Sequence, residues 1–466
     1  MKMRIMLIAA FFVLLTISSP ASAVVPDLRM SNLFNQEFDQ EPSCTSSHYE
    51  VLKSDLPPAE CSRIGLVSGG VAEYRIRINV GPGEYDYITL TNYVKEKRPW
   101  KINTGKNLVI LPGQGLTEQF YSDMAIYYAQ RKYSVYILDR RETNIPPDED
   151  DFSFMEYWTV EEHLNDTYIA INASRSHTSF LSKKPAENIE VTAIGHSHGA
   201  LILTAYEASQ YDDMPLGSVD RIVPVDIIIK YDPQYPELIY NQTQEFNIIS
   251  SEIENEVYEG TGMASMIYVA SMAYSNPEGS SPYPGLTNIQ LFRLMASQTY
   301  ILSSYPYTPD YHYWSGDLSG LSYVNESRLL YLTLSGGAAP FTPKYMDQFM
   351  AGLMGNVDGY EINSSSVDSP VLYVGLGGGF GDYGSWWYEN EAGNTNSRVT
   401  SMIWNNQGHA SLLIDQNSPE LWALIDNWIK NTEVTAQSIV NGAPMSAARI
   451  PSKTGKPFFF PVEMYA

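Results

Sequence analysis

The pattern of hydrophobic and polar residues predicts strands that alternate with helices along most of the chain. Two early stretches, residues 71–80 and 85–94, alternate between apolar and polar side chains, as strands with one buried face do. Six later runs are almost continuously apolar, as buried parallel strands are, and they lie at residues 107–111, 133–139, 189–194, 221–226, 370–375 and 399–404. Helical patterns end near Tyr128, cover residues 160–174, and place Leu421, Leu424, Ile425, Trp428 and Ile429 on one face. This order predicts an α/β protein with a mostly parallel sheet flanked by helices, whereas residues 24–70 are expected to be irregular.

A long segment interrupts this alternation between the strands at 221–226 and 370–375. A crossover between parallel strands needs only a fraction of these residues. The segment is rich in Tyr, Met and Ser and contains helical runs such as Ile289 to Ser304. We interpret residues 233–368 as a large, mainly helical cap inserted between the sixth and seventh strands; a peripheral helical domain away from the site is the alternative. The core then comprises residues 24–232 and 369–431, and a tail follows at 432–466.

The first 23 residues have the pattern of a secretory signal peptide. Two basic residues precede an apolar segment, which ends at Ala21-Ser22-Ala23, a typical cleavage site. The apolar segment is short for a membrane span, so an uncleaved anchor is the alternative. We expect a secreted or periplasmic mature chain that begins near Val24 and has no transmembrane segment.

Charge and cysteine content refine this picture. The chain has 53 acidic and 29 basic residues and a formal net charge of −24, which argues against nucleic acid as a partner because phosphates would be repelled. Cys44 and Cys61 are the only cysteines, and in an exported protein they are expected to form a disulfide, with two thiols as the alternative.

The candidate chemistry centres on Gly195-His196-Ser197-His198-Gly199. This G-x-S-x-G sequence follows a buried strand and precedes an apolar helix, which is the context of a nucleophile elbow. A serine at the top of such a sharp turn needs small neighbours, because the backbone is strained and side chains would collide. The motif therefore predicts that Ser197 is a nucleophile; an ordinary serine at a strand end is the alternative.

The chain resembles the α/β-hydrolase family over nearly all of its mature length. The matching pieces are Pro112-Gly113-Gln114, the elbow motif, and Gly408-His409 before the last helix, and the elbow looks like that of some secreted bacterial lipases. The resemblance implies that His409 is the catalytic base and that the backbone N–H groups of Gln114 and His198 form an oxyanion hole. Pro112 replaces the histidine that is usual in this family but leaves the N–H of Gln114 intact. The expected fold is the α/β-hydrolase fold with a cap.

The acid of the triad is left open between two main candidates. Asp226 ends the strand before the insertion, and Asp382 is the first acid after the strand at 370–375; Asp232 is a third alternative. The glycine-rich loop at 377–381 lacks the lysine of a phosphate-binding loop, so its glycines are expected to permit close backbone approach near the site.

Together these features predict a secreted serine hydrolase that cleaves carboxylic esters, as an esterase or lipase. The expected catalytic groups are Ser197, His409 and one of the two aspartates, and no metal or cofactor is required. The expected substrate is a small-molecule or lipid ester. An exported serine peptidase or amidase of the same fold is one alternative, and a catalytically silent protein that binds a ligand through the cap is the other.

Overall fold

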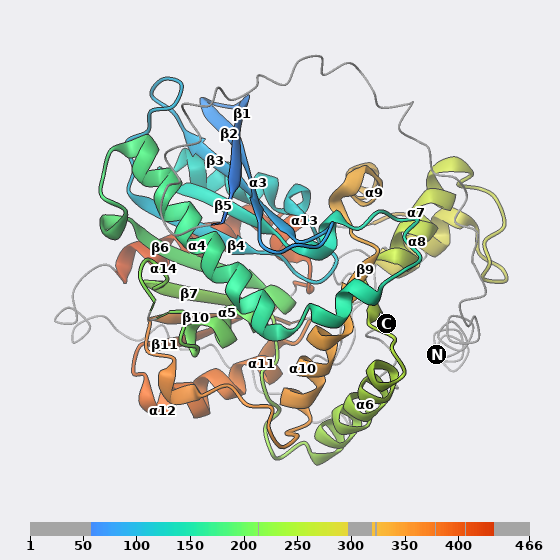
Figure 1. Cartoon of the computed structure of the whole chain (residues 1–466). Helices are drawn as coiled ribbons and strands as arrows, with labels where there is room; N and C mark the ends of the chain where they lie inside the picture. Colours follow the sequence, from blue (N-terminus) through green and yellow to red (C-terminus); the bar gives the residue numbers. More distant parts are fainter. Residues whose placement is uncertain are drawn as a thin grey trace.

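The structure, a computed structural model, describes residues 57–212, 214–296, 319–321, 324–377, 379–405 and 407–432 (Figure 1). The predicted signal peptide, Cys44 and the tail from residue 433 lie outside these residues. The disulfide is therefore not supported by the structure, in which Sγ of Cys61 lies 3.8 Å from Nε2 of His177. In the part of the chain that is described, no helix combines the length and hydrophobicity that a membrane span requires.

A nine-stranded sheet forms the centre of the molecule. Its spatial order is β1-β2-β3-β5-β4-β6-β7-β10-β11. The pairs from β5 to β11 are parallel, whereas β1, β2, β3 and β5 pair antiparallel. The strands are β1 (Ala59–Ser68), β2 (Val71–Asn79), β3 (Tyr87–Lys95), β4 (Lys106–Leu111), β5 (Ser134–Asp139), β6 (Glu190–His196), β7 (Arg221–Val225), β10 (Val371–Leu376) and β11 (Val399–Trp404).

Helices cover both faces of this sheet. The longer ones are α3 (Glu118–Gln130), α4 (Val160–Ser182), α5 (His198–Glu207), α6 (Pro236–Glu254), α7 (Ala264–Ser275), α8 (Asn288–Ala296), α10 (Lys344–Met354) and α14 (Ser418–Asn431). The shorter ones are α9 (Glu326–Leu332), α11 (Gly381–Trp387), α12 (Gly393–Thr395) and α13 (Ser411–Ile414). Helices α4, α5 and α11 pack on one face, and α3 and α14 pack on the other.

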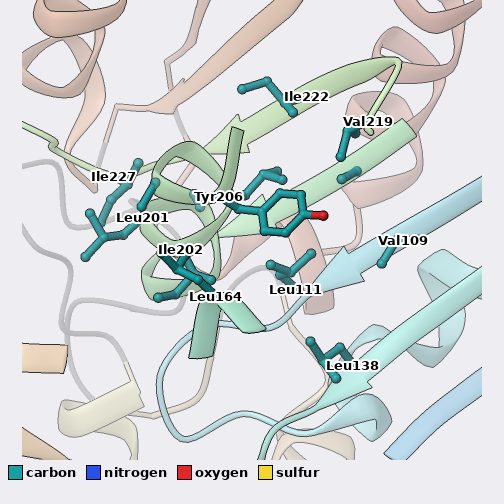
Figure 2. Close-up of a cluster of buried hydrophobic side chains, with 14 of the residues drawn as sticks. Val109, Leu111, Leu138, Leu164, Leu201, Ile202, Tyr206, Val219, Ile222 and Ile227 are labelled. Carbon is teal, nitrogen blue, oxygen red and sulfur yellow. The ribbon is translucent and has the colours of Figure 1, made fainter. Parts of the chain in front are cut away.

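The alternation of side chains along each strand explains this layered arrangement. In β4, Val109 and Leu111 face the core beneath α4 and α5, whereas Leu108 and Ile110 face the core beneath α3. Because both faces are covered, both sets are buried, and the parallel strands are continuously apolar in sequence. Figure 2 shows Leu201 and Ile202 of α5 in the core between this helix and the sheet.

The predicted strands and helices are confirmed, with one strand missed. Residues 59–68 were expected to be irregular, but they form β1, which pairs antiparallel with β2 at the edge of the sheet. Most of β1 is exposed or half-buried, and its register shifts near Gly65, so its residues lack a regular alternation.

The long insertion lies between β7 and β10. It holds helices α6 to α10 and a small antiparallel pair, β8 (Glu259–Thr261) and β9 (Phe341–Pro343). Helices α6 and α10 pack side by side, as do α7 and α8 (Figure 1). Because β1 precedes the predicted strands, the insertion follows the seventh strand of the large sheet, not the sixth, counted over the described residues. The expected helix at 289–304 is α8, and residues 297–304 lie outside the described part.

Candidate active site

Ser197 lies in a sharp turn between β6 and α5. Its backbone has φ 54° and ψ −126°, a conformation that residues other than glycine rarely adopt. The backbone N–H of Ser197 donates to the carbonyl of Val225 at 2.9 Å, which ties the turn to the next strand. The side chain is only half-buried, whereas both neighbouring histidines are buried. The turn thus has the geometry of a nucleophile elbow.

The glycines of the motif allow this turn to pack closely. A Cβ atom on Gly195 would lie 2.5 Å from Cα of Ala200, and one on Gly199 would lie 2.1 Å from the carbonyl oxygen of Leu111. Both obstacles are backbone atoms, which cannot rotate away as a side chain can. The requirement for glycine is therefore set by the packing of α5 against β4 and β6.

We expect Gly199→Ala to destabilise the protein strongly. The new methyl group would collide with the carbonyl oxygens of Leu111 and Pro112, at 2.1 and 2.5 Å. Separating α5 from β4 to relieve this overlap should cost about 2–4 kcal/mol of unfolding free energy. Urea unfolding would measure the change, and Gly320→Ala is the control because no atom of the described residues lies within 4 Å of its Cβ position. Equal stability of the two variants would contradict the packing argument.

His409 contacts Asp226, so the structure brings together the predicted base and one of the candidate acids. Nδ1 of His409 lies 2.7 Å from Oδ2 of Asp226. The carboxylate has no exposed surface, whereas 14% of the His409 side chain is exposed. Since an aspartate accepts, the proton of the neutral imidazole is on Nδ1, which leaves Nε2 as the basic nitrogen.

Backbone N–H groups hold the carboxylate of Asp226 in place. Oδ1 accepts from Leu376 at 2.8 Å and from Phe380 and Gly381 at 3.1 Å each. A Cβ atom on Gly379 would lie 1.8 Å from Oδ2, so this loop can wrap the carboxylate only with glycine there. The glycine-rich loop is thus the cradle of the acid, in keeping with the predicted close backbone approach.

The other two candidate acids take different positions. Asp382 lies in the first turn of α11, and Asp232 accepts from the backbone N–H and side-chain amide of Gln234 in a turn. No contact of either carboxylate with His409 is found among the described residues. The geometry therefore favours Asp226 over Asp382 and Asp232 as the carboxylate that orients His409.

The predicted oxyanion loop, residues 112–114, is fixed by buried polar side chains. Arg140 donates to the carbonyl oxygens of Pro112 at 2.7 Å and Gly113 at 3.2 Å. The N–H of Gly113 donates to the hydroxyl of Tyr121 at 2.7 Å. A Cβ atom on Gly113 would lie 3.3 Å from Cβ of Ser197, so the loop passes directly beside this serine. For the backbone N–H groups of Gln114 and His198, no acceptor is found within the described part of the chain.

The insertion contacts this loop through the side chain of Gln114. Its amide donates to Oδ1 of Asp347 in α10 and to the hydroxyl of Thr342 in β9, both at 3.0 Å. Oδ1 of Asp347 also lies 3.7 Å from Nε2 of His198, and burial lowers the pKa of His198 to about 3, so this contact is not an ion pair at neutral pH. Met346 of α10 lines a small cavity with Gln114 and His198. This part of the insertion is thus in contact with the site.

The buried carboxyl of Asp347 should make stability depend on pH. Burial raises its pKa to about 7 from 3.8, although the hydrogen bond from Gln114 acts in the opposite direction. Between these two values the folded protein keeps a proton that the unfolded chain has released, so stability falls as pH rises and the loss is complete above about pH 7. Asp347→Asn cannot ionise and should lose up to about 4 kcal/mol of this pH dependence.

Urea unfolding at pH 5 and pH 8 would measure the effect of Asp347→Asn. Asp232→Asn, in a turn outside the site, is the control and should behave as the wild type does. The same loss of stability between pH 5 and pH 8 in Asp347→Asn and the wild type would contradict the assignment.

No protein-family model matches the chain, and neither does any curated protein sequence. A solved structure of a protein from Sulfolobus solfataricus, provisionally named a lipase, matches with a TM-score of 0.53 and 15% identity over 80% of this chain and 99% of that one. The chain has the α/β-hydrolase fold. A carboxyl esterase from Bacillus coagulans, solved with glycerol, is also similar, with a TM-score of 0.46 and 12% identity over 78% of this chain and 99% of that one.

Within the α/β-hydrolase fold, the positions of the site residues follow from the topology. Ser197, Asp226 and the loop of Gln114 all come directly after parallel strands, β6, β7 and β4, so they meet at one edge of the sheet. The fold thus confirms the expected architecture.

Several supporting residues were not predicted from the sequence. The predicted oxyanion loop is held by Arg140 in the connection after β5, by Tyr121 of α3 and by Asp347 of α10. Only Arg140 carried a signal, since it directly follows the buried strand β5, where a charged residue is unusual unless it has partners. Among the described residues, no cluster of three or more His, Cys, Asp or Glu side chains could hold a metal ion.

Proposed function

We propose that this protein is a serine hydrolase that cleaves carboxylic esters through an acyl-enzyme on Ser197. The observation that carries the proposal is the 2.7 Å contact between Nδ1 of His409 and the buried Asp226, at the sheet edge where the strained elbow presents Ser197. A serine hydroxyl is a weak nucleophile at neutral pH and needs a base that is oriented by a third group. In this proposal Ser197, His409 and Asp226 supply these roles, and the chain shares its fold with the Sulfolobus solfataricus protein that is provisionally named a lipase.

The reaction begins when Oγ of Ser197 attacks the acyl carbon and Nε2 of His409 takes its proton. Asp226 keeps the proton of the imidazole on Nδ1 and stabilises the imidazolium that forms. The negative charge on the carbonyl oxygen is met by the backbone N–H groups of Gln114 and His198. His409 then gives its proton to the leaving alcohol, and a water molecule, activated in the same way, hydrolyses the acyl-enzyme and frees Ser197.

The substrate class and the location are part of the same proposal. The insertion contacts the oxyanion loop through Asp347 and Thr342, which supports a cap that shapes access for a bulky apolar ester. The pattern of residues 1–23 supports export, so the enzyme acts outside the cytoplasm, as a secreted or periplasmic protein.

Mass spectrometry of the mature protein after treatment with a fluorophosphonate would test the proposal. We expect stoichiometric labelling on Ser197 that is lost in Ser197→Ala and His409→Ala, together with hydrolysis of a short-chain ester. If the folded wild type is not labelled and does not cleave the ester, the proposal fails. Labelling with cleavage of peptide amides but not esters would make the protein a peptidase instead.

A further inference from the structure

His196, the residue before the nucleophile, bridges the oxyanion loop and the loop that carries the base. Its Nδ1 lies 2.9 Å from the hydroxyl of Tyr121, which accepts at 2.7 Å from the N–H of Gly113. Its Nε2 lies 2.7 Å from the backbone carbonyl oxygen of His409. The rings of the two histidines are 4.8 Å apart. The side chains of His196 and Tyr121 are buried, so neither bond is exchanged freely with water.

These hydrogen bonds form a series that runs from Gly113 through Tyr121 and His196 to His409. The groups at the two ends of the series fix the direction of every bond in it. The backbone N–H of Gly113 can only donate, so the oxygen of Tyr121 accepts and its proton is free for Nδ1 of His196. The carbonyl of His409 can only accept, so Nε2 of His196 carries the ring proton. Burial and the nearby His409 lower the pKa of His196 to about 3, while its bond to the His409 backbone acts in the opposite direction. The neutral ring therefore persists at working pH and satisfies all its partners.

We propose that His196 is a positioning residue, which holds the backbone of His409 at a fixed distance from the oxyanion loop. The inference rests on the proposed function, because it assigns a role to His196 in the reaction of Ser197. The strain of the elbow directs Ser197 toward the substrate, but the base arrives on a loop more than 200 positions later in the chain. His196 is the side chain that ties this loop to the elbow and, through Tyr121, to Gly113. Base and oxyanion donors are thus set in one hydrogen-bonded frame.

A buried core histidine with no part in the reaction is the alternative. One observation agrees with this alternative. A Cβ atom on Gly113 would lie 3.1 Å from Nδ1 of His196, so the ring fills the space beside the loop. The two roles differ in what they need from the ring. A filler needs its volume, whereas a positioning residue needs the N–H at Nε2.

A pair of variants separates these requirements. The amide nitrogen of glutamine can take the place of Nε2, so His196→Gln keeps a donor for the His409 carbonyl and loses the acceptor for Tyr121. Asparagine is shorter and reaches only the place of Nδ1, so His196→Asn keeps that acceptor and leaves the carbonyl without its donor. Both replacements are neutral and smaller than histidine, and both should lower the midpoint of thermal unfolding.

Steady-state hydrolysis of a short-chain ester and the rate of fluorophosphonate labelling would measure the result. We expect His196→Asn to lower kcat at least tenfold with KM changed less than threefold, since misplacing a base by a fraction of an ångström costs about this much. His196→Gln should retain at least a third of the wild-type kcat. Equal kcat values for the two folded variants, whether both are high or both are low, would overturn the inference. If the wild type itself is neither labelled nor active, the proposed function fails and the inference falls with it.

A measurement on the wild type covers the case in which a variant does not fold. Nitrogen NMR of protein with labelled histidine should show several rings that stay neutral from pH 5 to pH 8, because burial also lowers the pKa of His177 and His198 to about 3. One of these rings should carry its proton on Nε2, and its signal should disappear in His196→Gln and shift in Tyr121→Phe, which assigns it to His196. Protonation of His196 in this range, or a proton on its Nδ1, would overturn the inference.

Discussion

Ser197→Ala is expected to lower kcat for a short-chain ester by about 10⁵ to 10⁶-fold, with the fold intact. The change removes the atom that forms the acyl-enzyme and leaves the oxyanion donors and the base in place. The residual rate should therefore still exceed the rate of uncatalysed ester hydrolysis in water, because these groups continue to stabilise the transition state. Alanine tolerates the strained turn about as well as serine does, so the midpoint of thermal unfolding should change little.

Ser122→Ala is the matched control for this prediction. Ser122 lies on α3, where its hydroxyl donates to the carbonyl oxygen of Gln119, outside the site. The Ser122→Ala variant should retain the wild-type kcat. Ester hydrolysis that survives in Ser197→Ala within tenfold of the wild type would remove Ser197 from the reaction.

Asp226→Asn is expected to lower kcat by about 10⁴-fold, because it reverses the tautomer of the base. The amide oxygen of asparagine must occupy the Oδ1 position, where Leu376, Phe380 and Gly381 all donate. The amide nitrogen then points at Nδ1 of His409 and donates to it, which drives the ring proton to Nε2. A protonated Nε2 cannot accept the proton of Ser197. In the opposite orientation, the amide NH₂ would face three backbone N–H donors and leave them without an acceptor. This arrangement is unfavourable because the site is fully buried.

Asp382→Asn separates the two candidate acids. Its carboxylate lies in α11 without a described contact to His409, so kcat should stay within about threefold of the wild type. Stopped-flow or discontinuous ester assays at several pH values would measure both variants. A larger loss in Asp382→Asn than in Asp226→Asn would reverse the assignment of the acid.

Ser197 and His409 could be singled out from the sequence as the candidate nucleophile and base because their signals are local. Gly195, Ser197 and Gly199 stand between an apolar strand and an apolar helix, and the two glycines are required by contacts with α5 and with β4 beside the turn. His409 follows the last strand by a short loop, so its place at the sheet edge follows from the alternation of elements alone.

The acid could not be chosen from the sequence because the deciding contacts are remote. Asp226 and Asp382 both follow parallel strands, so both lie near the carboxyl edge of the sheet. What separates them is the loop after β10, whose N–H groups turn toward Asp226, about 150 positions earlier in the chain. Strand β1 was missed for a different reason, since an edge strand that is exposed or half-buried on most of its length leaves little alternation to detect.

The end of β7 has a practical consequence for engineering. Asp226 is the proposed acid and the first residue after β7, and φ at this residue is 50°, so the direction in which the chain continues and the position of the carboxylate are coupled. Ile227, Ile228, Ile229 and Tyr231 are all buried beneath it. A chimaera that exchanges the insertion for that of another hydrolase should therefore be joined after Tyr231. Moving the junction closer to β7 would alter the position of the Asp226 carboxylate even though none of the proposed catalytic residues was replaced.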